Sequence, residues 1–279
     1  MDIQRNIIID GPHIKPILAD SYLKDKNHSV VVFCHGYKGF KDWGCWDLAA
    51  RRFADEGHHF IKFNFSHNGG TVEQPLECPD PEAFGRNNFS IELDDLERVT
   101  DWIFSDDFES RYRYLPESLT VIGHSRGGGI AVIQAEENQK IDKVVSWAGV
   151  SDFKSRFANE EALSQWKQHG VIYIENSRTK QKLPHYIQFY EDFVQNESRL
   201  TISRAVKNLE KPYLIVHGDQ DPTVDVSEAR NLNNWNEKAE LTVIEGADHV
   251  FGGAHPWQKE RLPSALEKAV KATLEFIDK

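Results

Sequence analysis

Residues 123–127 read Gly-His-Ser-Arg-Gly, and this pentapeptide constrains the possible fold more than any other part of the chain. The apolar run at 119–122 predicts a buried strand before it, and the small and apolar residues at 127–133 predict a closely packed helix after it. A serine between a strand and a helix lies on a sharp, strained turn from which its hydroxyl projects freely. The pattern therefore predicts an α/β fold with Ser125 exposed at the end of a strand.

An acid and a histidine follow two later predicted strands. Residues 217–224 read His-Gly-Asp-Gln-Asp-Pro-Thr-Val after the apolar run 213–216, and residues 246–250 read Gly-Ala-Asp-His-Val after the strand-like run 241–244. Ser125, Asp221 and His249 are thus the candidate catalytic triad. Asp219 is the competing acid, and Asp221 is favoured because it begins the Asp-x-x-Val form that is usual at this loop.

The chemistry requires these residue types together. A serine hydroxyl is a weak nucleophile until an adjacent base takes its proton, and His249 would take it and later return it to the leaving group. Asp221 would hold the imidazole in the correct tautomer and stabilise the imidazolium. The backbone N–H groups of Arg126 and Tyr37 are the candidate oxyanion hole, since residues 34–39 (Cys-His-Gly-Tyr-Lys-Gly) follow the predicted strand 30–33.

The other polar residues near these motifs are expected to support the loops rather than to take part in catalysis. His35 and His217 are expected to anchor loops through hydrogen bonds, and Asp248 is expected to cap a loop. His124 is expected to pack or to line a pocket, with its side chain directed away from the triad.

Composition excludes several classes of function. The net charge of −11 argues against nucleic acid or an anionic membrane surface as a partner. No apolar stretch reaches the ~18 residues of a membrane span, and the first residues do not read as a signal peptide. Three cysteines make no disulfide framework, so we expect a cytoplasmic protein. The usual metal and nucleotide motifs are missing, so neither a metal nor another cofactor is expected.

Strands alternate with helices along the chain, which predicts a doubly wound, mostly parallel sheet. Strands are expected at 3–9, 14–18, 30–34, 60–65, 119–122, 143–147, 212–217 and 240–244, and helices at 46–56, 89–107, 226–236 and from about 257 to 277, with a loop from 66 to 88. Residues 1–150 and 207–279 would form this core. The segment 151–206 is too long for one crossover, and it reads as an inserted cap with helices and a hairpin at 170–186.

Aromatic residues are concentrated in this predicted cap, as expected where a segment covers a mostly apolar pocket. We expect most of them to attach the cap to the sheet and a few to line the pocket. Trp147, Phe153 and Tyr186 are the candidate substrate-binding residues.

On the motifs at 34–44, 123–128, 217–221 and 248–249, the chain resembles the α/β-hydrolase superfamily over nearly its whole length. More narrowly it is similar to dienelactone-hydrolase-like and prolyl-oligopeptidase-like hydrolases and to single-domain cinnamoyl (feruloyl) esterases, which carry a small hairpin-containing cap. Ser125 replaces the nucleophilic cysteine of true dienelactone hydrolases, and the propeller domain of prolyl oligopeptidases has no counterpart here.

The resemblance implies hydrolysis of carboxylic esters through an acyl-enzyme, without a cofactor. The expected substrate is a small-molecule ester with an aromatic or short-chain acyl group. A serine peptidase or amidase, or an acyltransferase, could use the same triad and remains the alternative.

Overall fold

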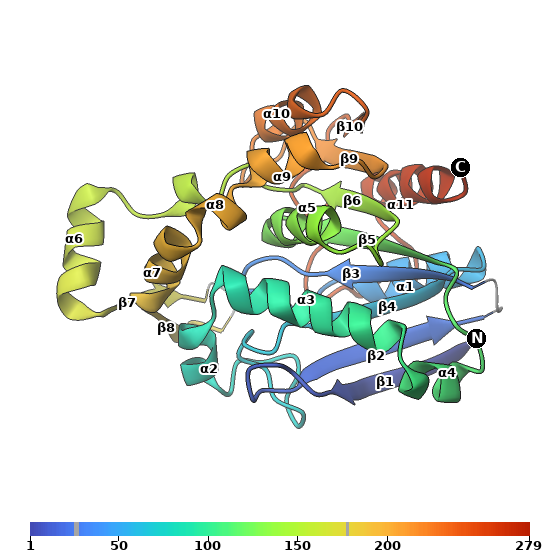
Figure 1. The fold of residues 1–279 in the computed structure, drawn as a ribbon, viewed down its shortest axis with the longest axis horizontal. Coiled ribbons are helices and arrows are strands. Elements are labelled where there is room, and N and C mark those ends of the chain that lie inside the picture. The colour runs from blue at the N-terminus through green and yellow to red at the C-terminus, as the bar shows by residue number, and fades with distance from the viewer. Residues whose placement is uncertain (25–27, 177–178) are drawn as a thin grey trace.

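An eight-stranded sheet forms the centre of the molecule (Figure 1). The computed structural model describes residues 1–24, 28–176 and 179–279. The strands lie in the order β1-β2-β4-β3-β5-β6-β9-β10. Their bounds are Asp2–Ile9 for β1, Ile17–Leu23 for β2, Ser29–Cys34 for β3, His59–Asn64 for β4, Ser118–His124 for β5, Lys143–Trp147 for β6, Tyr213–Gly218 for β9 and Glu240–Ile244 for β10.

Most of this sheet is parallel. Strand β1 pairs antiparallel with β2, and β2 pairs antiparallel with β4, whereas every pair from β4 to β10 is parallel. Parallel strands place all their carboxyl ends at one edge of the sheet, which is where sites form in open α/β folds. The ends of β5, β9 and β10 are therefore neighbours in space, although they lie far apart in sequence.

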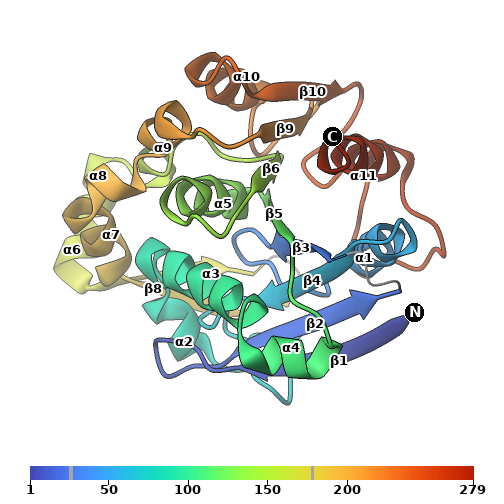
Figure 2. The ribbon, with the colours of Figure 1, turned by 45° about the vertical axis from the view of Figure 1, so that its right-hand side comes forward.

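Helices cover both faces of the sheet, as Figure 2 shows. Two hydrophobic clusters, one on each face, hold these layers together. On one face lie α1 (Trp46–Asp55) and α11 (Ser264–Ile277), and on the other lie α3 (Phe89–Ile103), α4 (Asp106–Tyr112), α5 (Arg126–Glu137), α9 (Ile202–Asn208) and α10 (Val226–Trp235). The predicted doubly wound α/β fold is confirmed.

Several predicted elements differ in detail. The helix expected at 89–107 is two helices, because Ser105 caps a new one by accepting a hydrogen bond from the N–H of Phe108 at 3.4 Å. Helix α2 (Pro81–Arg86) lies within the predicted loop and starts at the N-cap Asp80. The last helix begins only at Ser264, directly after Pro263, and the second strand runs over Ile17–Leu23 rather than 14–18.

Residues 151–206 contain the predicted hairpin. Strands β7 (Val171–Glu175) and β8 (Lys182–Tyr186) form a separate antiparallel pair, and residues 177–178 of its turn lie outside the described residues. The other elements of this segment are η1 (Lys154–Arg156), α6 (Glu160–His169), α7 (Gln188–Gln195), α8 (Glu197–Leu200) and most of α9. Because α9 crosses residue 206, the division between core and cap at that residue stays a prediction.

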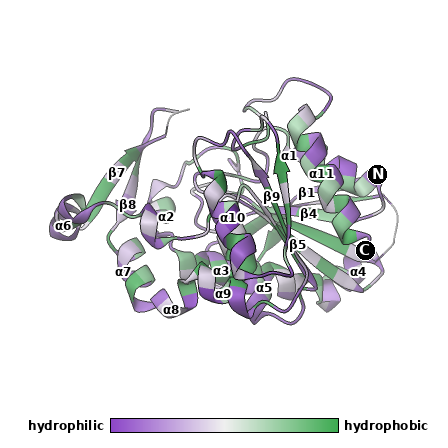
Figure 3. Cartoon of the chain, turned by 90° about the horizontal axis from the view of Figure 1, so that it is seen from above, coloured by the Kyte–Doolittle hydropathy of each residue, from purple (hydrophilic) through white to green (hydrophobic). Residues whose placement is uncertain are grey.

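Strand β5 carries strongly hydrophobic residues at Leu119, Val121 and Ile122, whereas α6 is largely hydrophilic (Figure 3). None of the helices in the described part of the chain combines the length and apolar character that a membrane crossing requires.

A buried network of charges joins β2, β4 and the loop before α1. Asp20 on β2 is directly opposite Lys62 on β4, and both side chains are fully buried. Lys62 contacts Asp20 at 3.2 Å, and Lys41 contacts Asp20 at 2.8 Å. Burial alone would raise the pKa of Asp20, but the two lysines hold it well below its usual range. Asp42, Asp47 and Arg5 complete the network, so that three carboxylates face three cations.

Candidate active site

Ser125 lies on the predicted turn between β5 and α5. Its backbone has φ 56° and ψ −121°, a conformation that non-glycine residues rarely adopt. Its N–H donates to the carbonyl of Trp147 at 2.9 Å, and its own carbonyl accepts from the N–H groups of Gly128 and Val150 at 2.9 and 3.2 Å. These bonds fix the turn and leave the side chain free to project at the carboxyl edge of the sheet.

The glycines that flank Ser125 are required by close backbone approach. A Cβ on Gly123 would lie 2.1 Å from the carbonyl oxygen of Gly127. A Cβ on Gly127 would lie 2.6 Å from the carbonyl oxygen of His35. The helix thus starts in direct contact with both β5 and the loop after β3, which gives the Gly-x-Ser-x-Gly pattern its physical basis.

The structure brings Ser125, His249 and Asp221 together. Nδ1 of His249 lies 2.7 Å from Oδ2 of Asp221, and Nε2 lies 3.0 Å from Oγ of Ser125. An ionised carboxylate can only accept, so Nδ1 carries the proton and the Nε2 of a neutral ring is left to accept from the serine hydroxyl. This is the tautomer that a general base needs.

Asp221 is held as a carboxylate. Burial would raise its pKa, but hydrogen bonds from His217, His249 and the N–H of Val224 keep the pKa well below its usual range. Its second oxygen, Oδ1, accepts from the N–H groups of Thr223 and Val224 at 2.8 and 2.9 Å. The carboxylate therefore stays charged and fixed beside the imidazole.

The competing acids brace loops. Asp219 accepts from the N–H of Gly246 at 2.7 Å, and its recorded bonds do not include His249. Asp248 accepts from the N–H groups of Val250 and Gly252 at 3.1 and 2.7 Å, as expected of a loop cap. Of the two candidate acids, only Asp221 reaches the histidine.

The neighbouring histidines hold the loops in place. His35 lies 2.9 Å from the carbonyl of Gly36 and accepts from the N–H of Phe65 at 3.3 Å, and His217 donates to the carbonyl of Val224 at 2.8 Å. His124 contradicts the expectation that it points away from the triad, because its Nε2 lies 2.9 Å from the carbonyl oxygen of His249. Burial lowers the pKa of His124 to about 3, so it stays neutral and fixes the backbone beneath His249.

The loop after β3 packs directly against the serine. A Cβ on Gly36 would lie 2.9 Å from Cβ of Ser125, so the next residue, Tyr37, is brought to the edge of the site. Among the described residues, no hydrogen bond is recorded from the backbone N–H of Tyr37 or of Arg126. These two N–H groups, on the residues that follow Gly36 and Ser125, are therefore available as donors.

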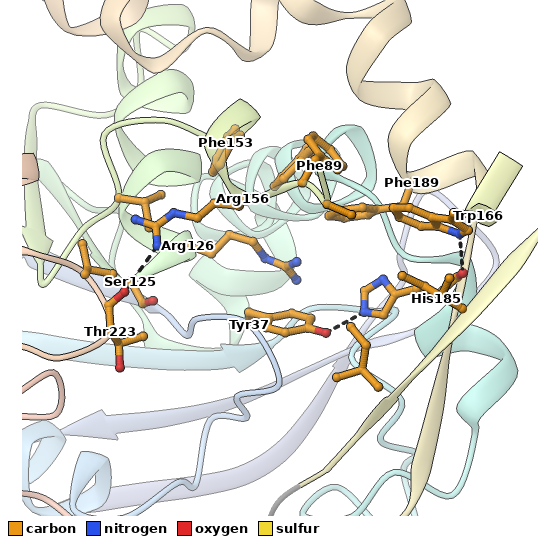
Figure 4. Close-up of a pocket in the computed structure, with 16 residues that line it drawn as sticks. Tyr37, Phe89, Ser125, Arg126, Phe153, Arg156, Trp166, His185, Phe189 and Thr223 are labelled. Carbon is orange, nitrogen blue, oxygen red and sulfur yellow. Dashed lines mark hydrogen bonds between the residues drawn. The ribbon is translucent and has the colours of Figure 1, made fainter. Parts of the chain in front are cut away.

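A cavity of about 400 Å³ opens from Ser125 toward the segment 151–206 (Figure 4). Its wall is mostly aromatic and aliphatic, with a few polar groups. The lining residues are Tyr37, Phe89, Ser125, Arg126, Val150, Phe153, Arg156, Phe157, Ala158, Trp166, Ile172, Ile174, His185, Phe189, Thr223 and Val224.

Of the three residues predicted to bind substrate, only Phe153 lines this cavity. Trp147 is fully buried on the opposite side of β6, where its Nε1 donates to Thr273 of α11 at 2.9 Å. Tyr186 faces α2 and donates its hydroxyl to Glu82. Side chains alternate across a strand, so the inward position on β8 belongs to the preceding residue, His185.

Two polar pairs in the cavity wall were not predicted from the sequence. The Tyr37 hydroxyl lies 2.6 Å from Nε2 of His185, and burial lowers the pKa of that histidine to about 4, so the pair is uncharged. The side chain of Arg126 points into the cavity and pairs with Glu92 of α3. The alternation of β8 could have indicated His185, whereas nothing in the sequence relates Glu92 to Arg126.

A second, smaller cavity of about 160 Å³ lies on the other side of Ser125. Its lining includes Ser125, His249, Trp43, Trp46 and Lys38. The serine thus separates an apolar space beneath the segment 151–206 from a smaller space beside the histidine.

Comparison with known proteins agrees with this architecture. A family model described as the alpha/beta hydrolase fold matches residues 85–252. No curated protein matches the chain by sequence. Similar solved structures include a putative hydrolase from Agrobacterium vitis S4 (TM-score 0.73, 18% identity, 99% of this chain and 100% of that one).

Two further structures are similar over almost their whole lengths. Est1E from Butyrivibrio proteoclasticus has a TM-score of 0.68 and 15% identity, with 99% of this chain and 100% of that chain covered. Dienelactone hydrolase from Anabaena variabilis has a TM-score of 0.65 and 16% identity, with coverages of 99% and 98%. At such identities the likeness concerns the fold.

Proposed function

The chain belongs to the α/β-hydrolase fold family, and from that premise we propose that it is a serine carboxylesterase acting on small-molecule esters. The observation that carries the proposal is the continuous hydrogen-bonded line from Asp221 through His249 to Ser125 at the entrance of an apolar cavity. The proposed triad is Ser125, His249 and Asp221.

Acylation follows from the positions of these groups. Nε2 of His249 takes the proton from Oγ of Ser125 as Oγ attacks the ester carbonyl carbon. The carbonyl oxygen becomes an oxyanion, and the N–H groups of Tyr37 and Arg126 are the proposed donors to it. The C–O ester bond then breaks, and the imidazolium returns its proton to the departing alkoxide. Water repeats the sequence to release the acid.

The two cavities suggest which part of the ester goes where. The departing alcohol must lie beside His249, because that residue protonates it, and the smaller cavity is the one lined by His249. The acyl group then occupies the larger cavity, where Phe153, Phe157 and Phe189 offer flat apolar surfaces. This arrangement supports short-chain or aromatic acyl groups as substrates.

Two further observations are consistent with this proposal. One of the similar structures is described as Est1E with ferulic acid bound, which is an aromatic acid. Cys34, Cys45 and Cys78 are free thiols, as expected for a protein of a reducing compartment, and we propose the cytoplasm.

Hydrolysis of ethyl and aryl esters by the wild type and Ser125→Ala tests the proposal. We expect turnover by the wild type, loss of essentially all activity in the variant, and covalent labelling by a fluorophosphonate only when Ser125 is present. An amide with the same acyl group serves as the comparison and should react far more slowly. Full activity in Ser125→Ala, or faster cleavage of the amide, would contradict the proposal.

A further inference from the structure

Arg126 is a largely buried cation in the wall of the larger cavity. Its side chain is 14% exposed, and the centre of its guanidinium lies 4.8 Å from the ring centroid of Tyr37. Phe89 and Phe189 lie at 5.8 and 5.7 Å. Figure 4 shows the guanidinium directed into the middle of the cavity, between these rings. Aromatic rings hold the charge in place without using its N–H donors.

Most of those donors have no acceptor within the described residues. A guanidinium has five N–H donors, and the one recorded hydrogen bond from the Arg126 side chain goes from Nη2 to Oε1 of Glu92. That same oxygen also accepts from the amide of Asn87 at 2.7 Å. The remaining N–H groups of Arg126 therefore have no acceptor among the described residues, and the guanidinium that carries them is directed into the cavity.

Glu92 pairs with Arg126 through only one of its two carboxyl oxygens. Its side chain is 3% exposed, and its second oxygen, Oε2, is buried without a hydrogen-bond partner among the described residues. Burial raises the pKa of this carboxyl group, although Arg126 acts against the rise. A guanidinium can bind both oxygens of a carboxylate through two parallel N–H···O bonds. Glu92 uses only one oxygen, so this two-bond contact is not formed.

The other arginine of this cavity is different. Arg156 pairs with Glu228 and also donates to the carbonyl of Thr223 at 3.3 Å. Its side chain is 35% exposed, so water can satisfy its remaining donors. Arg126 is thus the less exposed of the two arginines, and the guanidinium lies among aromatic rings.

We propose that Arg126 selects esters whose acyl group carries a carboxylate at its far end, so that the preferred substrates are half-esters of dicarboxylic acids. This inference rests on the proposed esterase function and specifies its substrate class. The ester carbonyl lies at Ser125, the carbon chain lies along the aromatic wall, and the free carboxylate binds the open N–H groups of Arg126. The carboxylate completes the charge pairing that Glu92 leaves unfinished.

Three ethyl esters of similar length test the charge preference, with hydrolysis followed by proton uptake or release in a pH-stat. Monoethyl adipate ends in a carboxylate, ethyl hexanoate ends in a methyl group, and the ethyl ester of ε-aminohexanoic acid ends in an ammonium. We expect kcat/KM to be on the order of 10- to 100-fold higher for the half-ester than for ethyl hexanoate, as a charged hydrogen-bonded pair provides. The ammonium ester should be the poorest. Monoethyl esters of succinic, glutaric and pimelic acids then identify the best chain length.

Variants of the ion pair should move this preference in opposite directions. The readout is the ratio of kcat/KM for the half-ester to that for ethyl hexanoate, so any general loss of activity cancels. Arg126→Met should reduce the ratio to one or below, and Arg126→Lys should keep part of it. Glu92→Gln should raise the ratio, because it removes the competing carboxylate. Arg156→Met, the matched control, should leave the ratio unchanged.

Binding to Ser125→Ala separates this proposal from the esterase proposal. Calorimetry with monoethyl adipate and ethyl hexanoate measures the preference without any turnover. The expected result is tighter binding of the half-ester, lost when Arg126→Met is added. Equal binding of the two esters, or a preference that survives Arg126→Met, would overturn the role of Arg126. If the half-ester binds more tightly but the wild type hydrolyses no ester, the esterase proposal fails and the carboxylate site stands.

Discussion

Ser125 has a positive φ because hydrogen bonds to the elements on either side hold its backbone in that conformation. Its N–H bonds to the end of β6, and its carbonyl accepts from residues on α5 and on the loop after β6. Such a conformation costs on the order of 1–3 kcal/mol and persists only where the surroundings determine it fully. The strain places Oγ 3.0 Å from Nε2 of His249, where the proposed chemistry needs it.

Asp221 and Asp219 provide a matched pair of substitutions. Asp221→Asn replaces the carboxylate that accepts from Nδ1 of His249 with an amide, which does not hold the imidazole in the same tautomer. The value of kcat should therefore fall on the order of 10⁴-fold. Asp219→Asn keeps an oxygen for the N–H of Gly246 and should change kcat far less. Steady-state kinetics of the two purified variants measure the difference, and a larger loss in Asp219→Asn would transfer the acid role to that residue.

Asp95 on α3 should make stability depend on pH. Burial raises its pKa to about 8, while its Oδ2 accepts from the N–H of Ser66 at 2.7 Å. Between the ordinary pKa of about 4 and the raised value, the folded state binds a proton that the unfolded chain has lost. This group therefore lowers the free energy of unfolding as pH rises through that interval, by at most about 1.4 kcal/mol per pH unit.

The substitution Asp95→Asn removes that titration. The free energy of unfolding of the variant, relative to the wild type, should rise steadily from pH 5 to pH 8 in urea titrations. Parallel pH profiles for the two proteins would show that Asp95 does not carry the raised pKa.

At the level of the element, strands β2 and β4 are joined by charge as well as by their backbone ladder. Lys62 on β4 is fully buried and contacts Asp20 on β2, Asp42 before α1 and Asp47 on α1, so the cation compensates carboxylates on three neighbouring segments. Removing one partner from a buried ion pair leaves charge without compensation inside the protein.

Lys62→Met should therefore cost on the order of 3–5 kcal/mol of stability. Lys24→Met is the control, because Lys24 and its partner Asp55 are both exposed and such pairs contribute about 1 kcal/mol or less. Thermal and urea unfolding measure both changes. Similar losses in the two variants would mean that the buried network is not what joins these strands.

For the whole molecule, burial differs sharply between the central sheet and the segment 151–206. Nine consecutive residues of α5, 127–135, are buried, whereas Trp166 is the buried residue of α6. Trp166 attaches that helix by donating its Nε1 to the carbonyl of His185 at 2.8 Å. Regions with few buried apolar contacts open more readily than the core.

Amide hydrogen exchange should show this difference. We expect the amides of α6 to exchange much faster than those of α5, and Trp166→Ala should increase the exchange of α6 and β7 without changing that of β5. Uniform protection across α5 and α6 would mean that the segment 151–206 is part of one cooperative unit with the core.

The sequence by itself determined the doubly wound order of strands and helices and the residues at the ends of β5, β9 and β10, because these depend on local patterns. Apolar periodicity marks each strand, and only glycine permits the close contacts around Ser125. The choice of Asp221 over Asp219 was also made from the sequence, and the contact with His249 agrees with it. The catalytic roles of these residues stay predictions.

Only the tertiary structure decided what lines the larger cavity. The sequence predicts Trp147 and Tyr186 as substrate-binding residues because they are aromatic. Each lies on the opposite face of its strand from the cavity. The pairing of Arg126 with Glu92 joins residues 34 positions apart on different helices. Long-range contacts of this kind arise from how the helices pack on the sheet, and no local sequence pattern encodes the orientation that packing imposes.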